Sequence, residues 1–362
     1  MNSDRKKPAA VPAAPSLQYT DTAYLTLASV ICACSVVFLH ANNAYWTFSA
    51  TERYWWTGNI IDGIFYFAVP VFFMITGSTL LDFYKRYDIG TYFKKRVTKT
   101  VIPYLFWSLF GLGLQIYYLE TIDPAEVDWI YIANGLSDGS LVAGYWFFPT
   151  LFGVYLSIPL FAAVSEDMRK RVFTYVSVTA FIVCILKSFL EDIFESPVLV
   201  PLSITVGSGY LFFIVTGYLI SHYEIPGRLR KVIYGLGIAG LMMDIVGTYL
   251  WSMEAGSVDR TFKGYTNVPS VLYATAAFVF FRQNGNRILE IPWIRKIVGF
   301  LGGYTFSIYL LHRFIIWVVT DWFSMDIFRL RYRLLMPFPV IAIAVAVTAL
   351  IRKIPILKRL LP

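Results

Sequence analysis

The stretch AYLTLASVICACSVVFLHANNAYW, residues 23–46, decides the fold. Its first seventeen residues contain no charged side chain, and the run ends at His40, which is followed at once by amides, a tyrosine and a tryptophan. At about 1.5 Å per residue, roughly 20 helical residues cross the ~30 Å hydrocarbon core of a bilayer. The stretch therefore predicts a transmembrane helix with an imidazole near the boundary between lipid and water.

The whole chain repeats this pattern. Of its 362 residues, 57% are hydrophobic and only 15% are charged, against about 25% charged residues in soluble domains. Mean hydropathy is +0.60. We therefore predict an all-α polytopic membrane protein with about ten transmembrane helices in one bundle. The predicted spans are 23–43, 61–82, 98–118, 145–164, 172–191, 201–221, 231–251, 267–283, 300–320 and 335–351.

The ends of the chain differ from this apolar body. Residues 1–20 are polar, basic and rich in proline and alanine, which predicts a disordered cytoplasmic tail without a cleaved signal. Residues 21–355 form the predicted transmembrane domain, and 356–362 a basic cytoplasmic tail. The three cysteines, Cys32, Cys34 and Cys184, fall inside predicted spans and are interpreted as packing residues, so no metal site is expected.

Basic residues predict the orientation, because short cytoplasmic loops of membrane proteins are rich in lysine and arginine. With the N-terminus inside, 23 of the 31 basic residues lie in cytoplasmic segments and six in outer loops. Both termini are then cytoplasmic, and residues 119–144 lie outside. The net charge of +8 is explained by topology, and nothing in it indicates a nucleic-acid partner.

A few ionisable residues fall within the spans or at their mouths, where each costs at least a few kcal/mol if it faces lipid. They are His40, Asp62, Lys187, Asp244, His312 and Arg313. Most are predicted to lie toward the outer face, around a polar cavity. For several of them a structural explanation stays open: Asp244 paired with Lys187 or with Arg313, and His312 as a hydrogen-bonded core residue.

Two groups of residues suggest ligand contacts. Near His40, the side chains of Asn43, Tyr45 and Trp46 suit a hydroxyl-rich ligand, although aromatic residues also gather at membrane surfaces. On the opposite side, Arg96 and Lys99 are three residues apart, which predicts one helix face. They suit a phosphate clamp, or simply anchor the chain on the cytoplasmic side.

Six stretches in order resemble the membrane acyltransferase family 3, especially its bacterial branch of polysaccharide and glycolipid O-acetyltransferases. They are SVVFLHANNAYW (35–46), VPVFFMITGSTLL (69–81), YFKKRVTKTVIPY (92–104), YWFFPTLFGVYLSIPL (145–160), FFIVTGYLIS (212–221) and YTFSIYLLHRFI (304–315). The resemblance covers nearly the whole chain. It implies a multi-pass enzyme of the bacterial cytoplasmic membrane that moves an acyl group, usually acetyl, from cytoplasmic acyl-CoA to a hydroxyl of an extracytoplasmic or lipid-linked glycan.

The resemblance also implies residue roles. The family's first-helix histidine corresponds to His40, the expected general base. Independently of the resemblance, Asp62 is expected near the same surface, where it orients the ring or holds the acceptor. Arg96 and Lys99 correspond to the basic pair expected near the CoA phosphates. Further matches are Trp146, Phe147 and His312. Of the aromatic residues, Tyr45, Trp46 and Trp146 are expected to offer apolar faces to a sugar.

The chain departs from the family at Ser29, where an arginine usually stands eleven residues before the histidine. A reaction that builds negative charge still needs a donor, and Arg313 is the candidate, with His312 polarising the acyl carbonyl or positioning the thioester. Two other functions stay open. One is a transporter or flippase for a lipid-linked sugar or similar anion; the other is an inactive family member that acts as an assembly partner.

Overall fold

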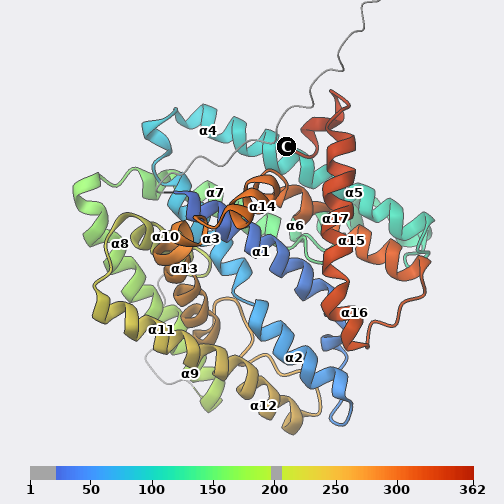
Figure 1. Cartoon of the computed structure of the whole chain (residues 1–362), viewed down its shortest axis with the longest axis horizontal. Helices are drawn as coiled ribbons and strands as arrows, with labels where there is room; N and C mark the ends of the chain where they lie inside the picture. Colours follow the sequence, from blue (N-terminus) through green and yellow to red (C-terminus); the bar gives the residue numbers. More distant parts are fainter. Residues whose placement is uncertain (1–21, 197–205) are drawn as a thin grey trace, which may run out of the picture.

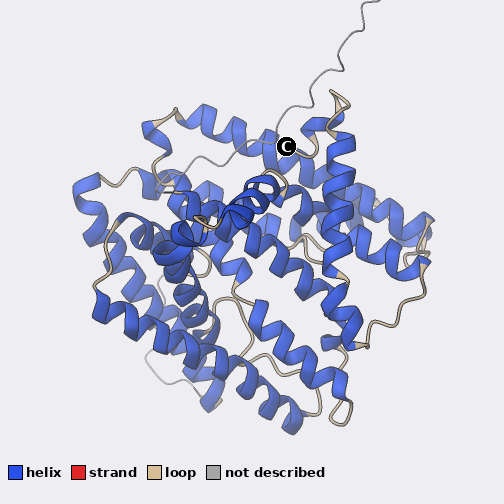
Figure 2. Cartoon of the chain, in the orientation of Figure 1, coloured by secondary structure: helices blue, strands red, loops and turns tan. Residues whose placement is uncertain are grey.

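The computed structural model describes residues 22–196 and 206–362, so the predicted tail 1–20 lies outside the described residues. Within these ranges every regular element is a helix (Figure 2). Seventeen α-helices follow the chain: α1 (Ala23–Ala41), α2 (Arg53–Phe65), α3 (Ala68–Leu80), α4 (Ile89–Arg96), α5 (Ile102–Tyr117), α6 (Trp129–Asp138), α7 (Phe147–Ala162), α8 (Glu166–Ala180), α9 (Lys187–Phe194), α10 (Leu211–His222), α11 (Gly227–Met242), α12 (Thr248–Ala255), α13 (Val268–Ile288), α14 (Pro292–Gly302), α15 (Thr305–Trp322), α16 (Leu330–Leu335) and α17 (Pro337–Ile351).

The helices confirm the all-α prediction and a multi-pass character, but not the count of ten spans. Six described segments are long and apolar enough to cross a membrane: Ala23–Ala41, Arg53–Lys85, Ile89–Tyr117, Glu166–Phe194, Gly227–Ala255 and Leu330–Ile351. A seventh is added if α14 and α15, bent by 73°, form one span. The helices α7 and α10 have only 16 and 12 residues, which rise about 24 Å and 18 Å.

Different helices lie at the two ends of the molecule. Figure 1 shows α2, α12 and α16 in the lower part of the view, and α4 with the C-terminus in the upper part. The helix α6 lies within the predicted outer loop 119–144, and its last turn returns to the body of the protein. There the Tyr104 hydroxyl, on α5, donates to the Leu136 carbonyl at 2.6 Å.

Three of the long spans contain a π-helical turn: Val97–Val101, Phe181–Leu186 and Met243–Gly247. A π-turn widens the helix and releases backbone groups from the regular ladder. In the third turn the Asn59 side-chain amide donates to the Ile245 carbonyl at 2.7 Å. The turn therefore ties α2 to the α11–α12 segment and presents Asp244, which it contains, to the protein interior.

The helices α3 and α10 touch backbone to backbone. A Cβ on Gly77 would collide with the Ile214 backbone, and one on Gly217 with the Met74 backbone. Beside this contact, the Ser78 and Ser221 hydroxyls lie 2.6 Å apart. Small residues that let helix backbones approach are a common means of packing helices in membranes.

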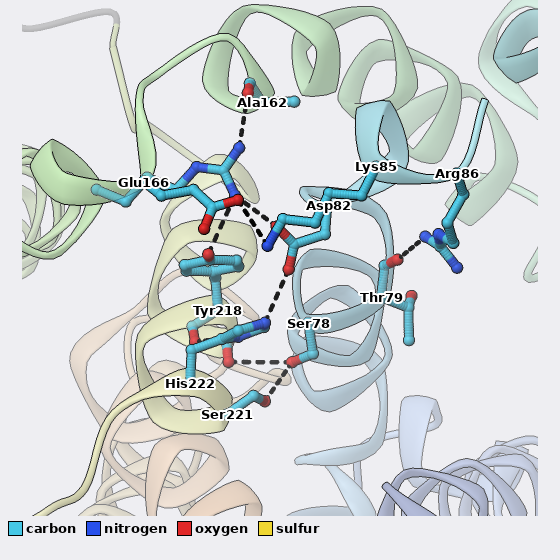
Figure 3. Close-up of polar contacts among 12 residues, drawn as sticks. Ser78, Thr79, Asp82, Lys85, Arg86, Ala162, Glu166, Tyr218, Ser221 and His222 are labelled. Atoms are coloured by element: carbon cyan, nitrogen blue, oxygen red, sulfur yellow. Dashed lines mark hydrogen bonds and ion pairs between the residues drawn. The ribbon is translucent and has the colours of Figure 1, made fainter. Parts of the chain in front are cut away.

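An ionic network fixes one end of this pair (Figure 3). The Asp82 carboxylate, just after α3, accepts from Arg169 Nη1 at 2.6 Å and lies 3.0 Å from His222 Nε2 at the end of α10. Arg169 is 4% exposed and also donates to the Ala162 and Val164 carbonyls that end α7. Three helices, α3, α8 and α10, and the end of α7 are thereby joined at one carboxylate.

Candidate active site

One cavity of about 540 Å³ collects six of the ten residues predicted as site residues. They are His40, Asn43, Trp46, Asp62, Trp146 and Arg313. The walls come from the end of α1, the short turn after it, α2, the segment before α7, α15 and the loop between α12 and α13. Residues that are far apart in the sequence therefore meet at one hollow, which is the candidate active site.

His40 is held between an arginine and a glycine. Arg313 Nη1 lies 3.4 Å from His40 Nδ1, and because a guanidinium only donates, Nδ1 accepts and the neutral ring carries its proton on Nε2. On the other side, a Cβ on Gly144 would lie 2.8 Å from Nε2. Gly144 has φ +93°, a left-handed conformation that favours glycine, and its carbonyl accepts from the Tyr309 hydroxyl at 2.8 Å.

His312 lies behind His40 and does not line the cavity. The two ring centroids are 4.9 Å apart, and His312 is 1% exposed. Its Nδ1 donates to the Tyr309 carbonyl at 2.6 Å, so the lone pair of the neutral ring is on Nε2, which has no hydrogen-bond partner among the described residues. In this tautomer the ring cannot donate to an acyl carbonyl through Nε2, and its contact is with His40 instead of the cavity.

Arg313 is 6% exposed and reaches the cavity beside His40. Its guanidinium carbon lies 5.3 Å from the Trp317 ring centroid, and no described carboxylate lies within ion-pair distance. The alternative in which Arg313 pairs with Asp244 is therefore wrong. A buried cation with no counter-ion beside a histidine is suited to an anion that forms during a reaction.

The partner of Asp244 is Lys263, which sequence reasoning placed in an outer loop. Lys263 Nζ lies 2.5 Å from Asp244 Oδ1 and 3.2 Å from Asp62 Oδ2, and the lysine is 4% exposed. Burial lowers the pKa of the Lys263 ammonium, but the two carboxylates outweigh it and the pKa is raised. The alternative pair of Asp244 with Lys187 is also wrong, because Lys187 binds Glu191 at 2.7 Å.

Asp62 lines the cavity, yet it forms an ion pair with Lys263. Among the described residues it makes no hydrogen bond with the His40 ring. The ring is held by Arg313 instead, so the structure does not bring Asp62 into the orienting position that was predicted. The carboxylate stays at the cavity wall, where an acceptor hydroxyl can reach it.

Aromatic rings form a second wall. Tyr265 stacks on Tyr66 with ring centroids 4.2 Å apart and on Trp146 at 5.4 Å. Trp46 and the exposed Asn43 lie at the other side of the hollow. Tyr45 is buried and does not line the cavity; it packs 6.3 Å from Trp55, centroid to centroid. Of the four residues predicted to contact a sugar, three line the cavity.

Comparison with protein families bears on what such a cavity does. A family model described as an acyltransferase domain, acyltransferase 3, matches residues 22–352. The chain belongs to the acyltransferase 3 family. Neither the curated proteins nor the solved structures contain a significant match. Family membership and the apolar helices together indicate a multi-pass membrane acyltransferase.

The basic pair of this acyltransferase lies on the helical segment before α5, and its two members have different surroundings. Arg96 packs its guanidinium carbon 5.4 Å from the Tyr155 ring centroid. Lys99 is exposed and lines a separate groove with Arg352, Lys358 and Arg359. The π-turn Val97–Val101 begins between them, so the regular α-helical spacing that predicts one shared face does not apply.

Ser29, where the acyltransferase resemblance expects an arginine, lies on α1 but does not line the cavity. From α1 only Val36, Leu39 and His40 reach the cavity wall. Phe147, at the start of α7, is buried behind the wall at 5.2 Å from the Tyr309 ring, centroid to centroid. The described cation beside the His40 ring is instead Arg313, whose Nη1 lies 3.4 Å from His40 Nδ1.

Proposed function

We propose that this acyltransferase moves an acyl group, acetyl in the first instance, from cytoplasmic acetyl-CoA to a hydroxyl of an extracytoplasmic or lipid-linked glycan. The observation that carries the proposal is the 3.4 Å approach of Arg313 Nη1 to His40 Nδ1 at the wall of the 540 Å³ cavity. A base and a cation side by side are what acyl transfer from a thioester requires.

The reaction proceeds by attack of the acceptor hydroxyl on the thioester carbonyl. As the substrates bind, the Arg313 guanidinium turns from His40 Nδ1 to the thioester carbonyl oxygen, which frees the single lone pair of Nδ1. As the new carbon–oxygen bond forms, Nδ1 takes the hydroxyl proton and the carbonyl oxygen becomes negative. The guanidinium of Arg313, adjacent to Nδ1, stabilises that oxyanion. When the intermediate collapses, the carbon–sulfur bond breaks, and the imidazolium returns its proton to the departing CoA thiolate.

His312 supports this step as a positioning residue. Its buried ring packs at 4.9 Å from His40, and its own proton is committed to the Tyr309 carbonyl. Asn43, Trp46, Trp146 and the Asp62 carboxylate face the acceptor in this proposal. Arg96 and Lys99 are proposed to hold the CoA phosphates at the cytoplasmic side, with Arg352 and Lys358 lining the same groove as Lys99.

The proposed location is the bacterial cytoplasmic membrane with both termini inside. The excess of basic residues in the segments assigned to the cytoplasm supports it. In the structure, α4 and the C-terminus, both assigned inside, lie toward the end opposite α2, α12 and α16, as Figure 1 shows.

The test compares two histidines in protein reconstituted into vesicles with labelled acetyl-CoA and a glycan acceptor. His40→Gln is expected to lower acyl transfer by about 100-fold or more, because a general base contributes about 10²–10⁴-fold. Binding of acetyl-CoA, measured by equilibrium dialysis, should remain. His222→Gln is the matched control, since His222 lies in the Asp82 network and does not line the cavity. Transfer by His40→Gln at the wild-type rate would reject the proposal.

A further inference from the structure

The acceptor cavity has an arginine that the proposed mechanism does not use. Arg260, on the loop between α12 and α13, lines the cavity, and its guanidinium carbon lies 4.6 Å from the Trp46 ring centroid. The side chain is exposed, and no described carboxylate lies within ion-pair distance of it. It therefore presents an unpaired cation at the rim, on top of a ring that suits a sugar face.

The loop that carries Arg260 is anchored on both sides. The Arg260 carbonyl accepts from the Lys263 backbone N–H at 2.9 Å, and the Lys263 side chain is fixed by Asp62 and Asp244. The adjacent Asp259 carboxylate accepts from the Thr261 N–H at 2.8 Å, so its described hydrogen bond is to backbone. Arg260 thus projects from a stable turn, which lowers the entropic cost of binding a ligand there.

The charges around the cavity leave a positive surplus for a ligand. Of the charged residues that line the cavity, Asp62 is negative and Lys263, Arg260 and Arg313 are positive. Two nearby carboxylates do not line it: Asp244 is held by Lys263, and Asp259 accepts from the Thr261 N–H. Arg313 lies beside His40 and serves the oxyanion of the transferred acyl group in the proposed function. Arg260 remains, and a guanidinium makes paired hydrogen bonds with a carboxylate or phosphate.

We propose that Arg260, stacked on Trp46, selects acceptors that carry an anionic group, a carboxylate or a phosphate, close to the hydroxyl that is acylated. This inference rests on the proposed function, because it names the class of its acceptor. A neutral glycan binds through the aromatic wall alone, whereas an acidic one adds a charge-assisted contact at the rim.

Binding to purified protein tests this without turnover, using matched ligands that differ in whether they carry anionic groups. The carboxylate pair is a tetrasaccharide of alternating glucuronic acid and N-acetylglucosamine and its methyl ester. The phosphate pair is N-acetylglucosamine 1-phosphate and methyl N-acetylglucosaminide. Wild type should bind the anionic member of one pair about tenfold more tightly at low salt, and the pair that responds identifies the group.

Variants of Arg260 test whether this residue causes the preference for anionic ligands. Arg260→Gln should remove the preference, and Arg260→Lys should keep part of it, because a lysine retains the charge but not the paired geometry. Arg53→Gln is the control: Arg53 is exposed at the start of α2 and does not line this cavity. A wild type without preference in either pair, or a preference that survives Arg260→Gln, overturns the inference.

A further binding measurement tests whether Arg260 contacts the donor and not the acceptor. Binding of adenosine 3′,5′-bisphosphate, which carries the nucleotide phosphates of CoA, should be the same in wild type and Arg260→Gln. A loss there would overturn the inference by assigning Arg260 to the donor. Charge-selective binding in a protein that transfers no acetyl group would instead uphold the anion site and reject only the proposed function.

Discussion

Arg313 carries a charge inside the protein that no described carboxylate offsets, and this isolation is its most informative property. Arg313→Ala is expected to lower acyl transfer by about 100-fold or more with the protein still folded, as loss of one oxyanion donor costs about 10²–10³-fold. Transfer from labelled acetyl-CoA measures the effect, and the melting temperature checks the fold.

The double variant Arg313→Ala with Ser29→Arg asks whether an arginine at the family position can serve the same site. Positions 29 and 40 are eleven residues apart and lie on nearly the same face of α1, so an arginine at 29 adds a positive charge on the face of the helix that carries His40, about 16 Å away along the axis. Partial recovery of transfer is expected. A single variant that only unfolds, or a double variant with no recovery in a folded protein, would contradict the assignment.

Lys263 is the second buried cation of the site, and it is paired with two carboxylates where Arg313 has none. Lys263→Met should lower the free energy of unfolding by about 3–5 kcal/mol, because it leaves Asp62 and Asp244 buried without their cation. A triple variant that also carries Asp62→Asn and Asp244→Asn should recover much of that loss. Thermal unfolding in detergent measures both, and a triple variant as unstable as the single one would argue against the ionic explanation.

At this scale the sequence identifies which residues are unusual more readily than how they pair. His40, Asp62, Asp244 and Arg313 stand out because charge and imidazole are rare in apolar spans. Lys263 does not stand out, because it lies in a polar loop whose return into the protein leaves no mark in hydropathy. The sequence nevertheless held a signal for such a partner, since an aspartate buried in a span, as Asp244 is, requires a cation close to it.

The helices pack closely where α3 crosses α10. Gly77→Ala should lower the melting temperature, with a cost of about 1–3 kcal/mol, because its methyl group would meet the Ile214 backbone and not a flexible side chain. Gly235→Ala is the control, since no atom lies within 4 Å of a Cβ at that position in α11. Alanine there should be neutral or stabilising by up to about 1 kcal/mol. Equal effects of both changes would show that helix propensity, and not the crossing, decides.

Helix positions were predictable from apolar runs, because crossing lipid requires a long uncharged segment. Their irregularities were not. The π-turn that separates Arg96 from Lys99 and the one that contains Asp244 leave composition unchanged. The helix α6 has only 10 residues and lies between Asp128 and a polar end at Asp138, so hydropathy does not separate it from the loop around it. Such features depend on contacts with other helices, which a local pattern does not contain.

The orientation of the whole molecule is predicted from its charge asymmetry and is open to direct measurement. In a background with Cys32, Cys34 and Cys184 changed to alanine, Ala125→Cys should react with a membrane-impermeant thiol reagent in intact cells. Ala125 is exposed in the segment before α6. Glu224→Cys, exposed between α10 and α11, should react only after lysis. The opposite pattern would place the termini outside.

The tie between α3 and α10 also limits how the cavity can open. These helices meet through glycine backbones, the Ser78 and Ser221 hydroxyls and the Asp82 network, so sliding of one along the other would break all three contacts at once. A rearrangement that opened the cavity would then have to come from segments outside this pair of helices. In the same cysteine-free background, a disulfide between Ser78→Cys and Ser221→Cys should leave turnover unchanged. The pair is thus expected to behave as a fixed frame during turnover.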